Sequence, residues 1–135
     1  RARVSPDRPL PSHLIQRLSP EYALLVVSRR SDWAEVCRRL ALPARLVSID
    51  LSTGPVIGVL AEVGQNADDD WPIRLVSIRN TTEGGILEAT FVHGVYYPVR
   101  TAAYLDLAKL TGTTTITTVR INSRVFTIHH PRGFN

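Results

Sequence analysis

Three side chains in this sequence could together carry out acid–base chemistry on a phosphodiester: His93, Lys109 and His129. Metal-independent cleavage of RNA needs a base for the 2′-hydroxyl, an acid for the leaving oxygen and a cation beside the phosphate. Two imidazoles and the single lysine of the chain supply those three functions, although no sequence motif joins them. They are therefore the candidate catalytic residues of a small, metal-independent ribonuclease-like enzyme.

Arginines and tyrosines in the same sequence also suit binding without catalysis. Aromatic rings stack on the bases of a single strand, and guanidinium groups contact its phosphates. Clustered cations would add the salt-dependent electrostatic part of the affinity. These residue types predict a contact with single-stranded nucleic acid through Arg29, Arg30, Arg38, Arg39, Tyr96, Tyr97 and Arg100.

The groups that bind metals are poorly arranged for that purpose. Asp68, Asp69 and Asp70 are adjacent, so they cannot all point into one calcium site, and a solvated loop is expected. His129 and His130 are neighbours at the end of an expected strand, where they would point to opposite faces. No metal site and no cofactor is therefore predicted.

Common catalytic and nucleotide-binding motifs are absent. The chain has no G-x-x-x-x-G-K-[ST], G-x-G-x-x-G, G-x-S-x-G, H-E-x-x-H or C-x-x-C sequence. Cys37, the only cysteine, falls on the apolar face of an expected helix, which predicts a core residue rather than a nucleophile. These absences make a non-catalytic domain the main expectation.

Charge is segregated along the chain, whose net charge is +4. Residues 1–45 hold nine Arg against four acids, residues 46–99 two Arg against seven acids, and residues 100–135 five basic residues against one acid. Basic and acidic faces could meet head to tail, as in the heterologous interfaces of viral or phage-like subunits. Assembly with a copy of itself or with a protein partner is thus the second binding hypothesis.

Length and composition indicate one globular domain. The chain has 135 residues, of which 44% are hydrophobic and 21% charged. Residues 1–11 contain three prolines and three arginines and are expected to form a flexible arm before a domain over 12–135. No apolar run is long enough to span a membrane. A single cysteine fits the cytoplasm, or the inside of a larger assembly, better than secretion.

Hydrophobic periodicity predicts the elements of the first half. A short helix is expected over 12–18 and a buried strand over 22–28. Apolar residues spaced i, i+3, i+4 and i+7 predict a helix over 32–41. Alternation predicts a strand over 45–51, and the strand–helix–strand unit suggests a parallel crossover.

In the second half, strands joined by turns dominate. A helix is expected over 102–110, with Tyr104, Leu107 and Ala108 on its inner side. Turn signals at 52–55, 81–85 and 122–123 separate the strands. The strands are expected over 55–63, 72–79, 86–92, 114–121 and 124–129.

Together these elements predict an α+β fold, a mostly antiparallel sheet of about six or seven strands with two or three short helices packed on it. The outward-facing Asp50 and Glu62 are expected to pair with Arg74 or Arg79 rather than act in catalysis. The main functional prediction is a non-catalytic binding or assembly domain for nucleic acid or protein. The alternative is the ribonuclease-like enzyme.

Overall fold

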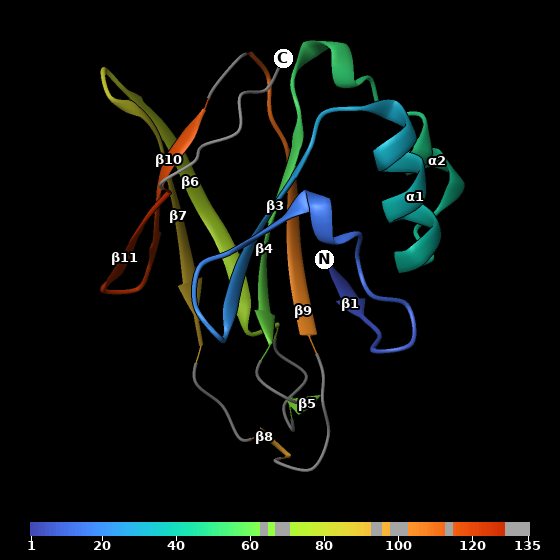
Figure 1. The fold of residues 1–135 in the computed structure, drawn as a ribbon, viewed down its shortest axis with the longest axis horizontal. Coiled ribbons are helices and arrows are strands. Elements are labelled where there is room, and N and C mark those ends of the chain that lie inside the picture. Colours follow the sequence, from blue (N-terminus) through green and yellow to red (C-terminus); the bar gives the residue numbers. More distant parts are fainter. Residues whose placement is uncertain (63–64, 67–70, 93–95, 98–102, 113–114, 129–135) are drawn as a thin grey trace.

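The computed structural model of the chain describes residues 1–62, 65–66, 71–92, 96–97, 103–112 and 115–128. Two sheets lie face to face, and two helices cover the far side of one of them (Figure 1). The predicted mixture of helices and mostly antiparallel strands is confirmed. The strands are divided between a five-stranded and a four-stranded sheet, however, whereas one sheet was expected.

The five-stranded sheet is antiparallel throughout and has the order β1-β9-β4-β3-β2. Its edge strand β1 lies within residues 1–11, the segment expected to be an arm, and pairs with the first half of β9. The strands of this sheet are β1 (Ala2–Val4), β2 (Ile15–Arg17), β3 (Tyr22–Val27), β4 (Val56–Glu62) and β9 (Ala103–Lys109).

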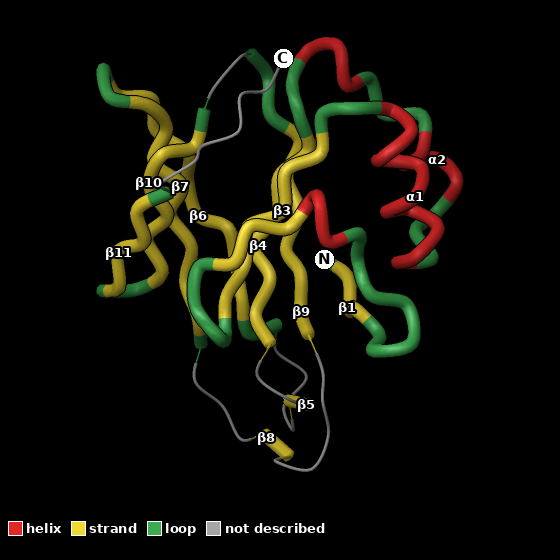
Figure 2. Tube along the Cα trace, in the orientation of Figure 1, coloured by secondary structure: helices red, strands yellow, loops and turns green. Residues whose placement is uncertain are grey.

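The four-stranded sheet has the order β11-β10-β7-β6, and its β7–β10 pair is parallel. A third, two-stranded pairing joins β5 (Gln65–Asn66) to β8 (Tyr96–Tyr97) below the two sheets (Figure 2). The expected strands in these regions are confirmed, with two-residue turns at 82–83 and 122–123. They are β6 (Ile73–Thr81), β7 (Gly84–Phe91), β10 (Ile116–Ile121) and β11 (Arg124–Thr127).

Helix α1 (Arg30–Leu40) confirms the helix predicted from hydrophobic spacing. Trp33, Val36 and Cys37 are buried on its inner face, as the periodicity requires. Cys37 is thus a core residue, as expected. The other helical segments are each a single turn: η1 (Ser12–Leu14), α2 (Ala44–Val47) and η2 (Leu51–Thr53).

Alternation along the central strands builds two cores. Leu24, Ile57 and Val59 face the four-stranded sheet and pack with Leu87 and Val119. Their neighbours along β3 and β4 face the helices instead. That second cluster includes Leu25, Val27, Val56, Leu60 and Leu105 from the strands, with Trp33 and Val36 from α1.

Two predictions in the first half are wrong. The helix expected over 12–18 is one 3₁₀ turn followed by β2, because residues 15–17 pair with β3. The strand expected over 45–51 is replaced by α2 and η2. β3 consequently pairs antiparallel with β4, and the predicted parallel crossover does not exist.

The helix expected over 102–110 is also wrong, because this segment is strand β9. Tyr104, Leu107 and Ala108 have helical spacing, but Tyr104 and Ala108 pack toward the four-stranded sheet while Leu107 packs toward the helices. A strand buried on both faces can carry apolar residues at any spacing. Pairing with β4 over seven residues outweighs the local helical pattern.

The predicted ion pairs of the two isolated acids are wrong as well. Glu62, the last residue of β4, accepts a hydrogen bond of 3.1 Å from Arg17, the last residue of β2. Asp50 caps η2 by accepting bonds from the backbone N–H and the hydroxyl of Ser52. Arg79 pairs with Glu88 at 3.0 Å instead.

Candidate functional site

Lys109 ends strand β9 and is the one predicted catalytic residue within the described part of the chain. Its ammonium donates to the hydroxyl of Thr53 at 3.0 Å and to the carbonyl of Leu110 at 2.5 Å. His93 and His129 lie outside the described residues. Convergence of the three groups therefore stays a prediction.

Two of the predicted nucleic-acid-binding arginines are already engaged within the chain. Arg38 and Arg39 both donate to Glu35, at 2.5–3.1 Å, and Arg39 also donates to the carbonyl of Pro9. The hydrogen bonds from these guanidinium groups lower the pKa of Glu35 to about 2. The single carboxylate of Glu35 balances one of these two positive charges, so the three side chains together keep one positive charge.

The remaining predicted arginines and tyrosines fall in three places. Arg29 and Arg30 are exposed at the beginning of α1. Tyr96 and Tyr97 form strand β8, and Arg100 lies outside the described residues. The predicted set is therefore not one surface among the residues that the structure describes.

A hollow of about 380 Å³ opens between the helices and strand β9. One wall is made by α1, α2 and the segment that follows α2, and the opposite wall by β4 and β9. The indole Nε1 of Trp33 donates to the carbonyl oxygen of Leu46 at 2.7 Å and so fixes α2 against α1. Apolar side chains cover most of the surface: Trp33, Leu42, Leu46, Ile49, Val56 and Leu107.

Three cations complete the lining of this hollow, namely Arg1, Arg45 and Lys109. No Asp or Glu is among the described residues that line it. Arg1 makes only a long contact, 3.9 Å, with Asp106, and Arg45 is exposed. Asp50 lies outside the lining of the hollow. The hydrogen bonds from Ser52 are the main reason that the pKa of Asp50 is lowered, and the positive charges of Lys109 and Arg30 lower it further. The hollow therefore combines apolar walls with cationic side chains.

Strand β9 contributes Leu107, Ala108 and Lys109 to the lining of the hollow. Leu107 packs against the core on the helix side, whereas Ala108 packs against the core between the two sheets.

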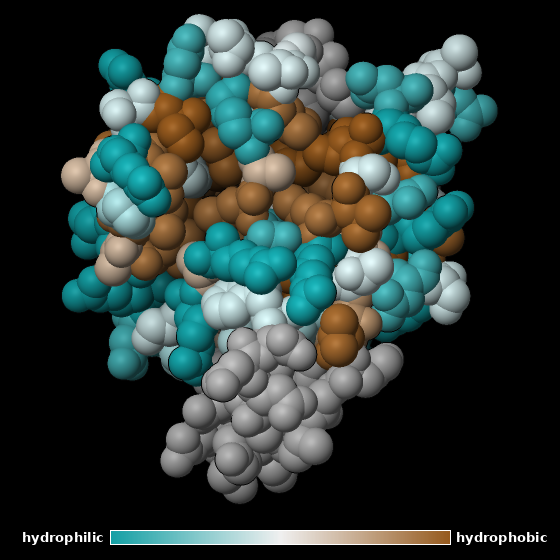
Figure 3. Space-filling view, turned by 180° about the vertical axis from the view of Figure 1, so that it is seen from behind, coloured by the Kyte–Doolittle hydropathy of each residue, from teal (hydrophilic) through white to brown (hydrophobic). Residues whose placement is uncertain are grey.

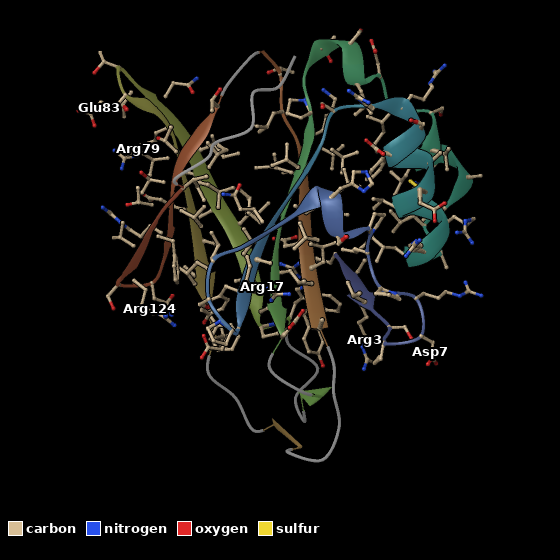
Figure 4. All side chains as sticks on the ribbon, in the orientation of Figure 1. Arg3, Asp7, Arg17, Arg79, Glu83 and Arg124 are labelled. Carbon is tan, nitrogen blue, oxygen red and sulfur yellow. The ribbon has the colours of Figure 1, made fainter. Side chains whose placement is uncertain are left out.

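A second groove lies between β2 and β11, the edge strands of the two sheets, with a volume of about 430 Å³. Arg17 and Arg124 stand on this side of the molecule (Figure 4). Arg17 is paired with Glu62 at 3.1 Å, and Arg124 with Glu21 at 3.4 Å. Because both cations have acidic partners, this groove offers less net charge to a ligand than the hollow beside the helices.

The outer face of the four-stranded sheet is not covered by a helix of the described chain (Figure 1). On it, Glu88 of β7 lies between Arg79 of β6 and Arg120 of β10, at 3.0 and 3.8 Å. This face thus carries a short ladder of alternating charge. Seen from behind, the molecule also carries a broad band of hydrophobic residues, which begins on the side of the helices (Figure 3).

Outside the gaps at 63–64, 67–70, 93–95, 98–102, 113–114 and 129–135, no three His, Cys, Asp or Glu side chains are grouped to hold a metal ion. None of the helices in the described residues is long and apolar enough to cross a bilayer.

Comparison with protein families, with characterised proteins and with solved structures finds no match for this chain. A functional proposal must therefore rest on the chemistry of the described residues.

Sequence reasoning missed this hollow because it placed 45–51 in a strand. Leu42, Leu46 and Ile49 are spaced i, i+4 and i+7, which is the signal of one helical face. Pro43, which directly precedes α2, is also typical of a helix start. Arg45 would then have been predicted beside that apolar face.

Proposed function

We propose that this chain is a non-catalytic binding domain for a protein partner, and that the hollow beside α2 and β9 receives a partner segment with an apolar side chain next to carboxylates. The observation that carries the proposal is the lining of the hollow: apolar walls, three cations and no acid among the described residues. Apolar burial would supply most of the affinity, and the cations would select the charge of the partner.

Several observations favour a protein partner over a nucleic acid. Single-stranded nucleic acids need exposed aromatic platforms, but Tyr22, Trp33 and Tyr104 are at most 8% exposed. Trp71 packs edge-on against Tyr104 at 5.0 Å between ring centroids. Arg38 and Arg39 share the carboxylate of Glu35, which holds both guanidinium groups within the chain. An apolar hollow is of little use to a phosphate backbone.

An acidic partner is also favoured over a second copy of this chain. The net charge of +4 makes copies repel each other, and the cations around the hollow add to that repulsion locally. An acidic segment of another protein would be attracted by the same charges.

The test uses a short, fluorescein-labelled peptide with one leucine between two glutamates in a background of threonine and valine. Binding is followed by anisotropy and by the emission of Trp33 in the Trp71→Phe protein, where Trp33 is the only tryptophan. We expect binding that shifts the Trp33 emission, and weaker binding when lysines replace the glutamates. Arg45→Glu should lower the affinity at least about tenfold, because it reverses a charge at a partly desolvated contact.

Arg8→Glu is the matched control, since it makes the same change of net charge on an exposed residue outside the hollow. Equal losses in both variants, or no binding at all, would overturn the proposal. Salt-sensitive binding of a labelled single-stranded RNA instead would favour the nucleic-acid alternative. Cleavage of that RNA, lost in His93→Ala, would favour the ribonuclease-like alternative.

A further inference from the structure

The register of the four-stranded sheet shows which of its side chains point away from the core, onto the outer face. Leu87 and Ala89 of β7 are buried between the two sheets, so Glu88 between them points outward. Arg120 of β10 lies opposite Glu88 in the parallel pair and points outward as well. Arg79 of β6 reaches Glu88 on the same face, at 3.0 Å. Two guanidinium groups therefore flank one carboxylate on the side of the sheet that no helix of the described chain covers (Figure 1).

A single carboxylate serves both of these arginines. Oε1 of Glu88 lies 3.0 Å from Nη2 of Arg79 and 3.8 Å from Nη1 of Arg120, and the two arginine side chains are 56% and 48% exposed. Arg74, opposite Thr90, adds a third guanidinium group to the outer face. Glu88 is the only acid in strands β6, β7, β10 and β11. With three arginines against one glutamate, the outer face of these strands carries an excess of two positive charges.

Hydroxyl groups, rather than aromatic rings, accompany these cations. Thr118 and Thr127 are cross-strand partners, and Thr118 lies two residues from Arg120 along β10, on the same face. The aromatic residues of the four strands, Phe91 and Phe126, pack into the core between the sheets. The outer face thus offers guanidinium groups and hydroxyls on an open sheet surface, without a ring on which a base could stack.

We propose that the outer face of the four-stranded sheet binds a sulfated polysaccharide through Arg74, Arg79 and Arg120. A sulfate ester presents several acceptor oxygens, as a phosphate does, and guanidinium groups bind such oxyanions by paired, charge-assisted hydrogen bonds. The threonine hydroxyls can exchange hydrogen bonds with the hydroxyls of the sugars. Such binding is independent of the hollow, which lies beside the helices on the other side of the five-stranded sheet.

The same face is less suited to nucleic acids. Single strands are held by stacking of their bases on aromatic rings as well as by cations, and both aromatic residues of these strands are turned into the core. Four strands about 4.8 Å apart span about 14 Å, which is wider than the major groove of about 12 Å, so the sheet cannot enter a duplex face-on. A linear polysaccharide has no groove to enter and can lie across the strands.

Glu88 competes with a bound sulfate for the arginines on either side of it. Glu88→Gln keeps the shape of the side chain but removes the competing charge, so it should strengthen binding. Arg79→Gln and Arg120→Gln each remove one contact with the polyanion and should weaken binding. A purely structural role of these three residues would not produce changes of opposite sign.

The experiment measures the binding of a fluorescein-labelled heparin oligosaccharide by anisotropy at about 0.15 M salt. Loss of one contact between a cation and a polyanion lowers the affinity about fivefold at this salt concentration. We expect at least about that loss in Arg79→Gln and in Arg120→Gln, and a gain in affinity in Glu88→Gln. Arg8→Gln is the matched control, since it removes the same charge from an exposed residue outside the four-stranded sheet. Circular dichroism checks that each variant is folded.

Equal losses in Arg8→Gln and in the two arginine variants of the sheet would mean that net charge alone attracts the oligosaccharide, and would overturn the proposal. Absence of binding, weaker binding in Glu88→Gln, or equal binding of the oligosaccharide after removal of its sulfates would overturn it too. Tighter binding of a labelled single-stranded RNA, lost in the same variants, would assign this face to nucleic acid instead. The peptide test of the hollow uses Arg45→Glu, so either proposal can fail without the other.

Discussion

The indole Nε1 of Trp33 donates a 2.7 Å hydrogen bond to the main-chain oxygen of Leu46. This bond joins the first turn of α1 to the single turn of α2, whose N-cap residue, Pro43, makes no side-chain hydrogen bond. Since isolated turns of helix are unstable, α2 depends on such tertiary contacts. The same bond sets the position of one wall of the hollow.

We therefore expect Trp33→Phe to lower the free energy of unfolding by about 2 kcal/mol, because it removes a hydrogen bond and part of a buried ring. Urea unfolding followed by circular dichroism measures this. Trp71→Phe is the control: its indole makes a longer, 3.3 Å bond to Leu105 and is only partly buried, so it should cost about 1 kcal/mol. A larger loss in Trp71→Phe would contradict the importance of the bond between Trp33 and Leu46.

Glu35 should make stability depend on pH in the acid range. The hydrogen bonds from Arg38, then those from Arg39, lower its pKa to about 2, from 4.5. A carboxyl with a lowered folded-state pKa stabilises the fold above about pH 4.5, and this contribution is lost as the pH falls toward 2. Glu35→Gln should thus be less stable than the original protein at neutral pH, and the difference should vanish near pH 2.

Unfolding midpoints at about pH 7, pH 4 and pH 2 test this pH dependence. Glu83→Gln, which removes an exposed carboxylate from the β6–β7 turn, controls for the loss of one negative charge. A difference between Glu35→Gln and the original protein that stays constant from neutral to acid pH would contradict the expectation.

Gly54 should tolerate no side chain. An added Cβ would lie 2.3 Å from the carbonyl oxygen of Leu110, and φ is +149°. Gly54→Ala should cost about 3 kcal/mol or more, because main chain would have to move where η2 meets the end of β9. Gly112→Ala is the control that keeps the backbone strain but has no steric clash. The φ of Gly112 is +90°, and no atom lies within 4 Å of an added Cβ, so we expect a loss of stability of about 1 kcal/mol. Similar losses of stability in the two variants would show that the main chain near Leu110 can move away from the added Cβ at little cost in free energy.

Cys37 should react slowly with thiol reagents in the native protein. Its side chain is buried under α1, and burial raises the pKa of the thiol, which lowers the thiolate fraction. We expect the native rate with a disulfide reagent to be at least about 100-fold below the rate in denaturant, since reaction must await local opening. Comparable rates in the two conditions would mean that α1 does not protect this thiol.

Local sequence patterns were sufficient where one periodicity dominates. Trp33, Val36 and Cys37 specify the buried face of α1, and alternation specifies β7. The turn at Asn122 also follows from its residue type, because Asn accepts the positive φ of 54° found there. Each of these features depends on residues that are close together in the sequence, so local sequence patterns are enough to predict it.

Other features depend on contacts between distant residues. β9 is a strand because β4 pairs with its whole length and because apolar layers receive it on both faces, which erases the alternation that marks a strand. The tertiary structure also decides which basic side chains lie at the hollow. Glu35 compensates Arg38 within one helix, whereas Arg45 and Lys109 meet at the hollow only after α2 and β9 have packed together.

The sequence by itself thus determined the class of fold, most strands, the long helix and the excess of arginine. Only the tertiary structure decided how the strands divide into two sheets and which cations surround an apolar hollow. The reason is physical: periodicity reports which side of an element is buried, but not which element buries it. The hollow that forms where β9 meets α2 is a property of that packing.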